Sequence, residues 1–183
     1  MKKYELTAEF IEKWGKKLFR IKALISFGSV EVGELGGYVE KEDNLAQDGN
    51  AWVYGNAWVY GNARVCGDAE VYGNAWVCGD ARVCGDARVY GNADYLLIGR
   101  IGSRFSFTTF FKNKDKGITV SCGCFLGTIA EFRAKVSDTH GNNKHAKIYN
   151  LAADMAELQI LGEEYFDKLN TKYAIRIQRR VVT

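Results

Sequence analysis

Residues 49–93 read GNAWVY GNAWVY GNARVC GDAEVY GNAWVC GDARVC GDARVY GNA, one six-residue unit repeated with almost no drift. A unit this short cannot bury its own apolar face, so successive units must stack on one another to form a core. Valine and alanine recur at fixed positions, and Gly-Asn or Gly-Asp separates them. We therefore expect the valines and alanines to point inward and the Gly-Asn or Gly-Asp pairs to form turns.

An inward aliphatic residue, a turn and a small corner residue at this spacing resemble the hexapeptide repeat of left-handed parallel β-helices. In that family three units form one triangular coil, which implies that residues 18 apart lie one above another at about 4.8 Å. The same frame extends outward to residues 35–106, or twelve units in four coils. The outer units are degenerate, as expected of capping units.

The residues beside each inward valine are expected to point outward, in columns set by the 18-residue spacing. Arg64, Arg82 and Arg100 form one column, which repels itself and favours acidic partners or an anionic ligand, and Glu40 falls in the column of Trp58. Two faces are rich in aromatic residues, which favours their burial under another subunit or the C-terminal region. The candidate interface residues are Trp52, Tyr54, Trp58, Tyr72, Trp76 and Tyr90.

The flanking segments predict a mainly β protein with a C-terminal α part. A hairpin of residues 4–10 and 18–27 is expected to cap one end of the repeat. After the repeat we expect strands at 107–112 and 117–122, a loop at 123–127, and a helix that Thr128 begins through a capping box with Glu131. A second helix is predicted over about 144–161, and its apolar stripe is Ile148, Leu151, Ala152, Met155 and Leu158. We expect residues 163–170 to extend this helix and residues 173–183 to form an edge strand.

These elements divide the chain into an N-terminal β cap over residues 1–34, a β-helix over 35–106 and an α+β region over 107–183. No apolar run approaches the roughly 20 residues of a membrane span, and the N-terminus lacks the apolar core of a signal peptide. We therefore expect a cytoplasmic protein. The five cysteines, an odd number, favour free thiols in a reducing compartment.

Charge and histidine content restrict the chemistry. The formal net charge is +3, and residues 95–183 carry an excess of six basic side chains, which favours an anionic partner but not nucleic acid in particular. Acyltransferases of the hexapeptide family use a histidine as general base, whereas residues 35–106 contain none. His140 and His145 are too few for a three-histidine zinc site, and Cys122-Gly-Cys124 has poor spacing for zinc. A reactive pair of Cys124 with a histidine, or simple packing, stays open.

The place where the repeat ends is the strongest candidate for a specific site. Residues 99–104, GRIGSR, suggest a phosphate loop but lack the Gly-Lys-Ser/Thr ending of a Walker motif. The first turn of the helix at Thr128 offers backbone N–H groups for an anion. We expect no catalytic residue, cofactor or metal. The candidate ligand-binding residues are Arg82, Arg100, Ser103, Arg104, Thr108, Thr109, Cys124, Thr128 and His140.

The segment LGGYVEKEDNL, residues 35–45, and the blocks IGSR, TTFF, CGCF and THG resemble small hexapeptide-repeat proteins of bacteriophages and prophages over residues 15–160. The resemblance implies the architecture and a phage context, in which small accessory proteins often counter host defence. We therefore expect a non-enzymatic homo-oligomer, by fold analogy a trimer, that sequesters a host protein or a small nucleotide-like anion. An acyltransferase using His140 and a structural role through end-to-end stacking are the alternatives.

Overall fold

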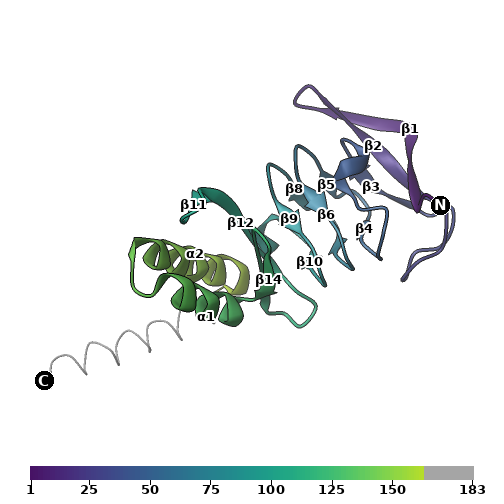
Figure 1. Ribbon diagram of the computed structural model, residues 1–183. Coiled ribbons are helices and arrows are strands. Elements are labelled where there is room, and N and C mark those ends of the chain that lie inside the picture. The colour runs from purple at the N-terminus through teal and green to yellow at the C-terminus, as the bar shows by residue number, and fades with distance from the viewer. Residues whose placement is uncertain (163–183) are drawn as a thin grey trace, which may run out of the picture.

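The protein is elongated, with a β-hairpin at one end, short strands side by side in the middle, and a sheet with two helices at the other end (Figure 1). This computed structural model describes residues 1–162. The chain is mainly β with helices α1 (Ile129–His140) and α2 (Lys144–Leu161) following the strands. The predicted helical extension at 163–170 and edge strand at 173–183 lie outside the described residues.

The repeat forms two-residue strands that pair in parallel. They are β4 (Trp52–Val53), β5 (Trp58–Val59), β6 (Arg64–Val65), β7 (Glu70–Val71), β8 (Trp76–Val77), β9 (Arg82–Val83) and β10 (Arg88–Val89). Three ladders result: β4–β7–β10, β5–β8 and β6–β9. Within them Val53 pairs with Val71 and Val71 with Val89, so the predicted 18-residue spacing is confirmed.

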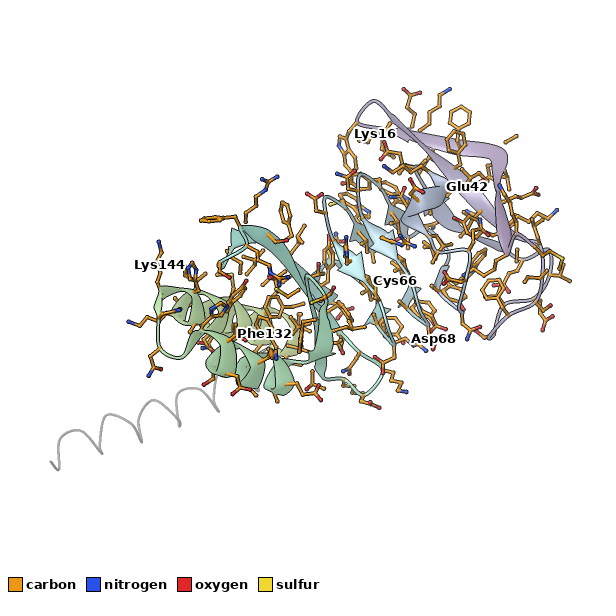
Figure 2. The ribbon with its side chains drawn as sticks, in the orientation of Figure 1. Lys16, Glu42, Cys66, Asp68, Phe132 and Lys144 are labelled. Atoms are coloured by element: carbon orange, nitrogen blue, oxygen red, sulfur yellow. A yellow bond between two sulfur atoms is a disulfide. The ribbon has the colours of Figure 1, made fainter. Side chains whose placement is uncertain are left out.

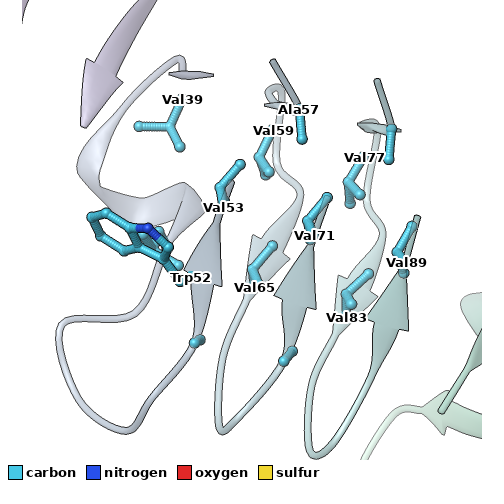
Figure 3. Packing of buried hydrophobic residues seen from close by; sticks show 14 of the residues in the cluster. Val39, Trp52, Val53, Ala57, Val59, Val65, Val71, Val77, Val83 and Val89 are labelled. Carbon is cyan, nitrogen blue, oxygen red and sulfur yellow. The ribbon is translucent and has the colours of Figure 1, made fainter. Parts of the chain in front are cut away.

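The valines and alanines of the repeat point into one continuous core, as predicted (Figure 3). Each buried valine contributes about 1.5–3 kcal/mol relative to an exposed one. At the corner of Gly67, glycine is required for two reasons. Its φ is +71°, and a Cβ there would lie 2.9 Å from the backbone nitrogen of Gly85 in the next rung. A side chain at position 67 would therefore be strained and would clash with the next rung.

The frame slips by two residues on the N-terminal side, where the sequence predicts no insertion. In β3 (Leu35–Val39), Tyr38 pairs with Trp58, 20 residues along the chain, and Leu45 bridges Val65 at the same spacing. The expected stacking of Glu40 with Trp58 is therefore wrong. The two extra residues fall in the segment 46–51. The buried ammonium of Lys3 donates hydrogen bonds to three carbonyls of that segment, of which Ala51 is nearest at 2.9 Å.

The frame also ends earlier than expected. After β10 and a short 3-10 turn (Asn92–Asp94), β11 (Tyr95–Ile101) pairs antiparallel with β12 (Ser106–Lys112). The expected units at 95–106 are therefore part of a different sheet. Arg100 does not extend the arginine column, in which Arg64 pairs with Arg82. Among residues 1–162, with β3 and Leu45 included, each ladder holds three rungs, not the four expected.

The predicted N-terminal hairpin is present as β1 (Tyr4–Lys13) and β2 (Lys16–Ala23), with a tighter turn than expected and a second strand that ends at Ala23 instead of residue 27, and it also covers an aromatic face. The ring of Trp14 at its turn lies 5.9 Å from that of Trp58 and 5.2 Å from that of Trp76, which stack on each other. We expected another subunit or the C-terminal region there. The same end of the chain buries Trp52 completely, so its predicted outward position is wrong. Tyr4 and Phe27 pack edge-on against its indole.

A second aromatic column stays partly open. Tyr54, Tyr72 and Tyr90 stack on successive rungs with ring centroids 4.5 and 4.9 Å apart. Tyr90, on the last rung, is 57% exposed.

Cys66 and Cys84 form a disulfide, which contradicts the prediction of free thiols at these two positions. They occupy equivalent positions on adjacent rungs with Cα atoms 4.7 Å apart, a distance set by the ladder. Cys78, Cys122 and Cys124 are free cysteines.

Strands β11 and β12 continue into β13 (Ile118–Cys122) and β14 (Phe125–Thr128), an antiparallel sheet between the ladders and the helices. Phe111 packs into the core of the ladders, whereas its neighbour Phe110 packs against the helices, because strand residues alternate between faces. The predicted loop at 123–127 is shorter than expected, since its last three residues belong to β14. The capping box is confirmed: the Glu131 N–H donates to Thr128 Oγ1.

Helix α2 buries a different face from the one predicted. Its buried residues are Ala146, Tyr149, Ala152, Ala153, Ala156 and Ile160. Of the predicted stripe, Ala152 is buried, whereas Leu151, Met155 and Leu158 are exposed. Alanines let α2 approach α1 and the sheet closely, which leaves the larger side chains outside. Arg133 of α1 joins the two helices through ion pairs with Asp154 and Glu157. No helix within residues 1–162 is long and apolar enough to span a membrane.

Asn44 is expected to be essential for the first corner of the repeat, the short 3-10 turn Glu42–Asn44 that follows β3. Its buried amide donates to the carbonyls of Gly61 and Ala63 and accepts from the Lys41 N–H. Asn44→Ala leaves these backbone groups unpaired and should lower the free energy of unfolding by about 2–3 kcal/mol, measured by urea denaturation. Asn74→Ala, at an exposed corner, is the control and should change it by less than about 0.5 kcal/mol. If the two variants lose the same free energy of unfolding, the Asn44 hydrogen bonds do not hold this corner.

The buried ammonium of Lys3 should make the free energy of unfolding depend on pH. Burial lowers the pKa of its ammonium from 10.5 to about 8, against the opposing effect of Asp48. Between these values the unfolded chain binds the proton more tightly, so the stability that Lys3 contributes rises with pH. The free energy of unfolding of the wild type relative to Lys3→Met should therefore rise from pH 8 to about 10. Lys2→Met, which removes an exposed ion pair with Glu42, should show no such trend; the same slope in both variants refutes the explanation.

Candidate functional site

Two hollows flank one end of the C-terminal sheet, where the β11–β12 turn and the β13–β14 turn lie next to each other. The ladder-side hollow, of about 450 Å³, is lined by Asn62, Asp80, Arg82, Arg104, Ser106, Phe107, Thr109, Ser121, Gly123 and Cys124. The helix-side hollow, of about 270 Å³, is lined by Ser103, Arg104, Ser106, Cys122, Gly123, Cys124, Phe125, Phe132, Lys135, Val136, Thr139, His140 and Tyr149. Arg104, Ser106, Gly123 and Cys124 belong to both.

The ladder-side hollow is polar and carries two guanidinium groups. Arg82 comes from the last rung of its ladder, where its backbone N–H donates to Thr109 Oγ1 at 3.1 Å. Arg104 comes from the β11–β12 turn. Within residues 1–162, neither forms an ion pair with a carboxylate. The carboxylate that does line this hollow, that of Asp80, accepts a hydrogen bond from the Asn62 amide at 3.2 Å.

The helix-side hollow is lined mainly by rings. Tyr149 of α2 stacks on His140 with centroids 5.8 Å apart and meets Phe132 edge-on at 5.6 Å. Phe132 lies between the helices and the sheet (Figure 2). Burial raises the pKa of the Tyr149 hydroxyl to about 12, with Cys122 adding to the shift and Arg104 opposing it. Tyr149 is therefore a neutral hydrogen-bonding group near pH 7.

Two glycines place Arg104 between the hollows. Gly102 has φ +73°, and a Cβ there would lie 1.9 Å from Tyr149 Oη, so the β11–β12 turn rests directly on α2. Gly123 has φ +62°, and a Cβ there would lie 3.3 Å from Arg104 Nη1. The guanidinium thus extends across the β13–β14 turn, at the rim that the two hollows share.

The structure brings six of the predicted ligand-binding residues to the hollows: Arg82, Ser103, Arg104, Thr109, Cys124 and His140. Three do not line them. Arg100 lies with its guanidinium 5.9 Å from the ring centroid of Phe107. Thr108 is buried and donates to Cys122 Sγ at 3.2 Å. Thr128 caps α1, and its N–H holds the pKa of the Glu131 carboxyl below the usual value.

The expected anion site at the first turn of α1 therefore does not coincide with the hollows. Thr128 Oγ1 already accepts from a first-turn N–H, and the Glu131 carboxylate adds negative charge there. The C-terminal half of α1, from Lys135 to His140, lines the helix-side hollow instead.

Several lining residues were not predicted. Asn62 and Asp80 precede Arg64 and Arg82 by two residues, so the 18-residue register could have placed them beside the arginine column. Lys135 and Tyr149 carry no such signal, because only the packing of the two helices on the sheet brings them to this end of the sheet. Within residues 1–162, no group of three or more His, Cys, Asp or Glu side chains is arranged to hold a metal ion.

Gly102 provides a test of how the turn is held. Gly102→Ala introduces a methyl group into the space of Tyr149 Oη and should displace the turn and open the helix-side hollow. Gly141→Ala is the matched control, since Gly141 also has positive φ but nothing within 4 Å of the added carbon. Gly102→Ala should lower the free energy of unfolding by at least about 1 kcal/mol more than Gly141→Ala in urea denaturation. Equal losses mean that Tyr149 does not support the turn.

One comparison with known proteins matches part of the repeat. A family model described as the YdcK β-solenoid repeat matches residues 63–79 and 81–93. These residues carry β6 to β10, so the match agrees with the parallel ladders and supports a β-solenoid repeat. No curated protein matches the chain. The similarity covers Arg82 but none of the turns or helices that complete the hollows, so it concerns the architecture and not the ligand.

Proposed function

We propose that this protein is a non-enzymatic binding protein that holds a small anionic, nucleotide-like ligand in the two joined hollows. The observation that carries the proposal is the approach of Arg82 and Arg104 to one polar space with no carboxylate partner within residues 1–162. Within the described part of the chain, the two guanidinium groups outnumber the one carboxylate that lines this hollow, that of Asp80, and a bound phosphate or carboxylate would offset the excess positive charge. The planar fork of arginine suits either group.

The second hollow indicates what the rest of such a ligand looks like. A flat ring beside Tyr149, His140 and Phe125 would be stacked between apolar and aromatic surfaces. Asn62 and Asp80 in the first hollow can donate to and accept from sugar hydroxyls. A ring in one hollow and a sugar with a phosphate in the other describe a nucleotide, with Arg104 at the rim that the two hollows share.

An acyltransferase is the second candidate, and one observation favours it. His140, the histidine that such an enzyme could use as general base, lines the helix-side hollow. Acetyl-CoA binding with turnover that is lost in His140→Ala supports this alternative and contradicts a purely binding role.

We also propose that the ladders are the sides of a left-handed parallel β-helix of about three coils. The 18-residue register and the repeat match support a β-solenoid with three six-residue units per coil, and an experimental electron-density map tests its hand directly. The phage resemblance of the sequence further suggests a cytoplasmic role against host defence, with a host nucleotide signal as the ligand. A phage-infection assay with Arg104→Ala tests that role: unchanged infection of a defended host argues against it.

Calorimetry with a panel of mononucleotides and cyclic oligonucleotides tests the ligand proposal. At least one nucleotide should bind, and Arg82→Ala and Arg104→Ala should each weaken its binding at least about tenfold, the value of one charge-assisted hydrogen bond. Arg64→Ala is the matched control, because Arg64 is the neighbouring rung of the same column but does not line either hollow. No binding by any nucleotide, or equal losses in all three variants, refutes the proposal.

A further inference from the structure

The lining of the helix-side hollow contains charged hydrogen-bond donors and no charged acceptor. Arg104 and Lys135 line it, whereas no Asp or Glu side chain of residues 1–162 does. Within the same residues Lys135 forms no ion pair, although Glu131 and Asp138 lie about one turn away on α1. The Lys135 ammonium can therefore donate to a bound molecule without first leaving a carboxylate.

The helical spacing of α1 explains why Lys135 lines this hollow. Phe132, Lys135, Val136 and Thr139 follow one another at intervals of three, one and three residues, so all four lie on one face of α1. Phe132 and Val136 are buried, whereas Lys135 and Thr139 are exposed. The buried pair therefore lies on the inner side of the hollow, and the exposed pair lies on its solvent side.

The rings of the hollow restrict how a base can lie in it. Phe125, Phe132, Tyr149 and His140 form a continuous series of ring contacts, with successive centroids 5.6, 5.6 and 5.8 Å apart. A base stacked on these rings offers its edges for hydrogen bonds. The sugar leaves past the rim at Arg104, so the edge of a purine that carries its C6 substituent points away from that rim, toward α1 and the Lys135 ammonium.

We propose that the ligand is an oxopurine nucleotide, with guanine or hypoxanthine as its base, and that Lys135 selects this base. The inference rests on the proposed function, because it concerns the ring of that ligand. Lysine has three N–H donors and no acceptor. An oxopurine presents two acceptors, O6 and N7, at the edge that meets Lys135, whereas adenine presents N7 beside an amino donor. With adenine two donors face each other, and one of them loses its partner.

The same lining predicts that the 2-amino group of guanine adds little to binding. This group is a donor, and a carboxylate is the acceptor that would bind it most strongly. Among residues 1–162 no carboxylate lines the helix-side hollow, and Asp80 lines the ladder-side hollow alone. Guanine and hypoxanthine differ only in this amino group, so their nucleotides should bind about equally.

Calorimetry with two matched series tests the inference: the 5′-monophosphates and the cyclic dinucleotides of inosine, guanosine and adenosine. In at least one series the inosine and guanosine members should bind at least about tenfold more tightly than the adenosine member, the effect of one hydrogen bond to a charged group. Lys135→Met keeps an unbranched side chain and should remove this preference by weakening the inosine and guanosine members. Lys147→Met is the matched control and should keep the preference, since Lys147 is an exposed lysine of α2 that lines neither hollow.

The outcomes separate this inference from the proposed function. If no member of either series binds, both are wrong. If the three bases bind alike, or adenosine binds best, while Arg82→Ala weakens every member, the anion-binding role stands and the oxopurine preference is wrong. A preference that persists in Lys135→Met overturns the role of Lys135. Circular dichroism of Lys135→Met checks that the fold is kept, as expected for an exposed side chain.

Discussion

Backbone hydrogen bonds between successive rungs are the interaction on which the rest of the molecule depends. The N–H of Trp58 donates to the Ala75 carbonyl at 2.9 Å, and the N–H of Tyr60 donates to the Val77 carbonyl at 3.0 Å. The carbonyls of each rung accept hydrogen bonds from the N–H groups of the rung before it, and its own N–H groups donate to the rung after it. A stack of this kind therefore has two ends at which buried or exposed backbone groups need partners from outside the repeat.

Both ends are closed by segments that do not repeat. At the N-terminal end the side chains of Lys3, Tyr4 and Asn44 bind backbone carbonyls around the first corner. At the C-terminal end Asn92 Oδ1 accepts from the Trp76 N–H and Thr109 Oγ1 accepts from the Arg82 N–H. The candidate site is a consequence of this second closure, because the strand that supplies Thr109 also brings the turn of Arg104 beside Arg82.

The predictions from sequence succeed where one local pattern decides the structure. The inward valines, the 18-residue register, the N-terminal hairpin and the Thr128 capping box all depend on residues close in the chain or on a strict period. They fail where two patterns compete. Residues 95–106 fit the six-residue frame loosely but also alternate as an antiparallel strand, and the pairing with β12 prevails. Helix α2 has two apolar faces, and the one with alanines is buried because it allows closer packing.

The sequence alone therefore determined the repeat of residues 49–93 and its 18-residue spacing, since both follow from six-residue periodicity and turn chemistry. It also indicated Arg82, Arg104 and His140 as residues of interest, through charge and the interruption of the repeat. Only the tertiary structure decided which of the candidates meet, that Trp14 covers the Trp58 face, and that Tyr149 and Lys135 join the site. The reason is physical: these contacts join segments tens of residues apart through packing and cap geometry, which no local pattern encodes.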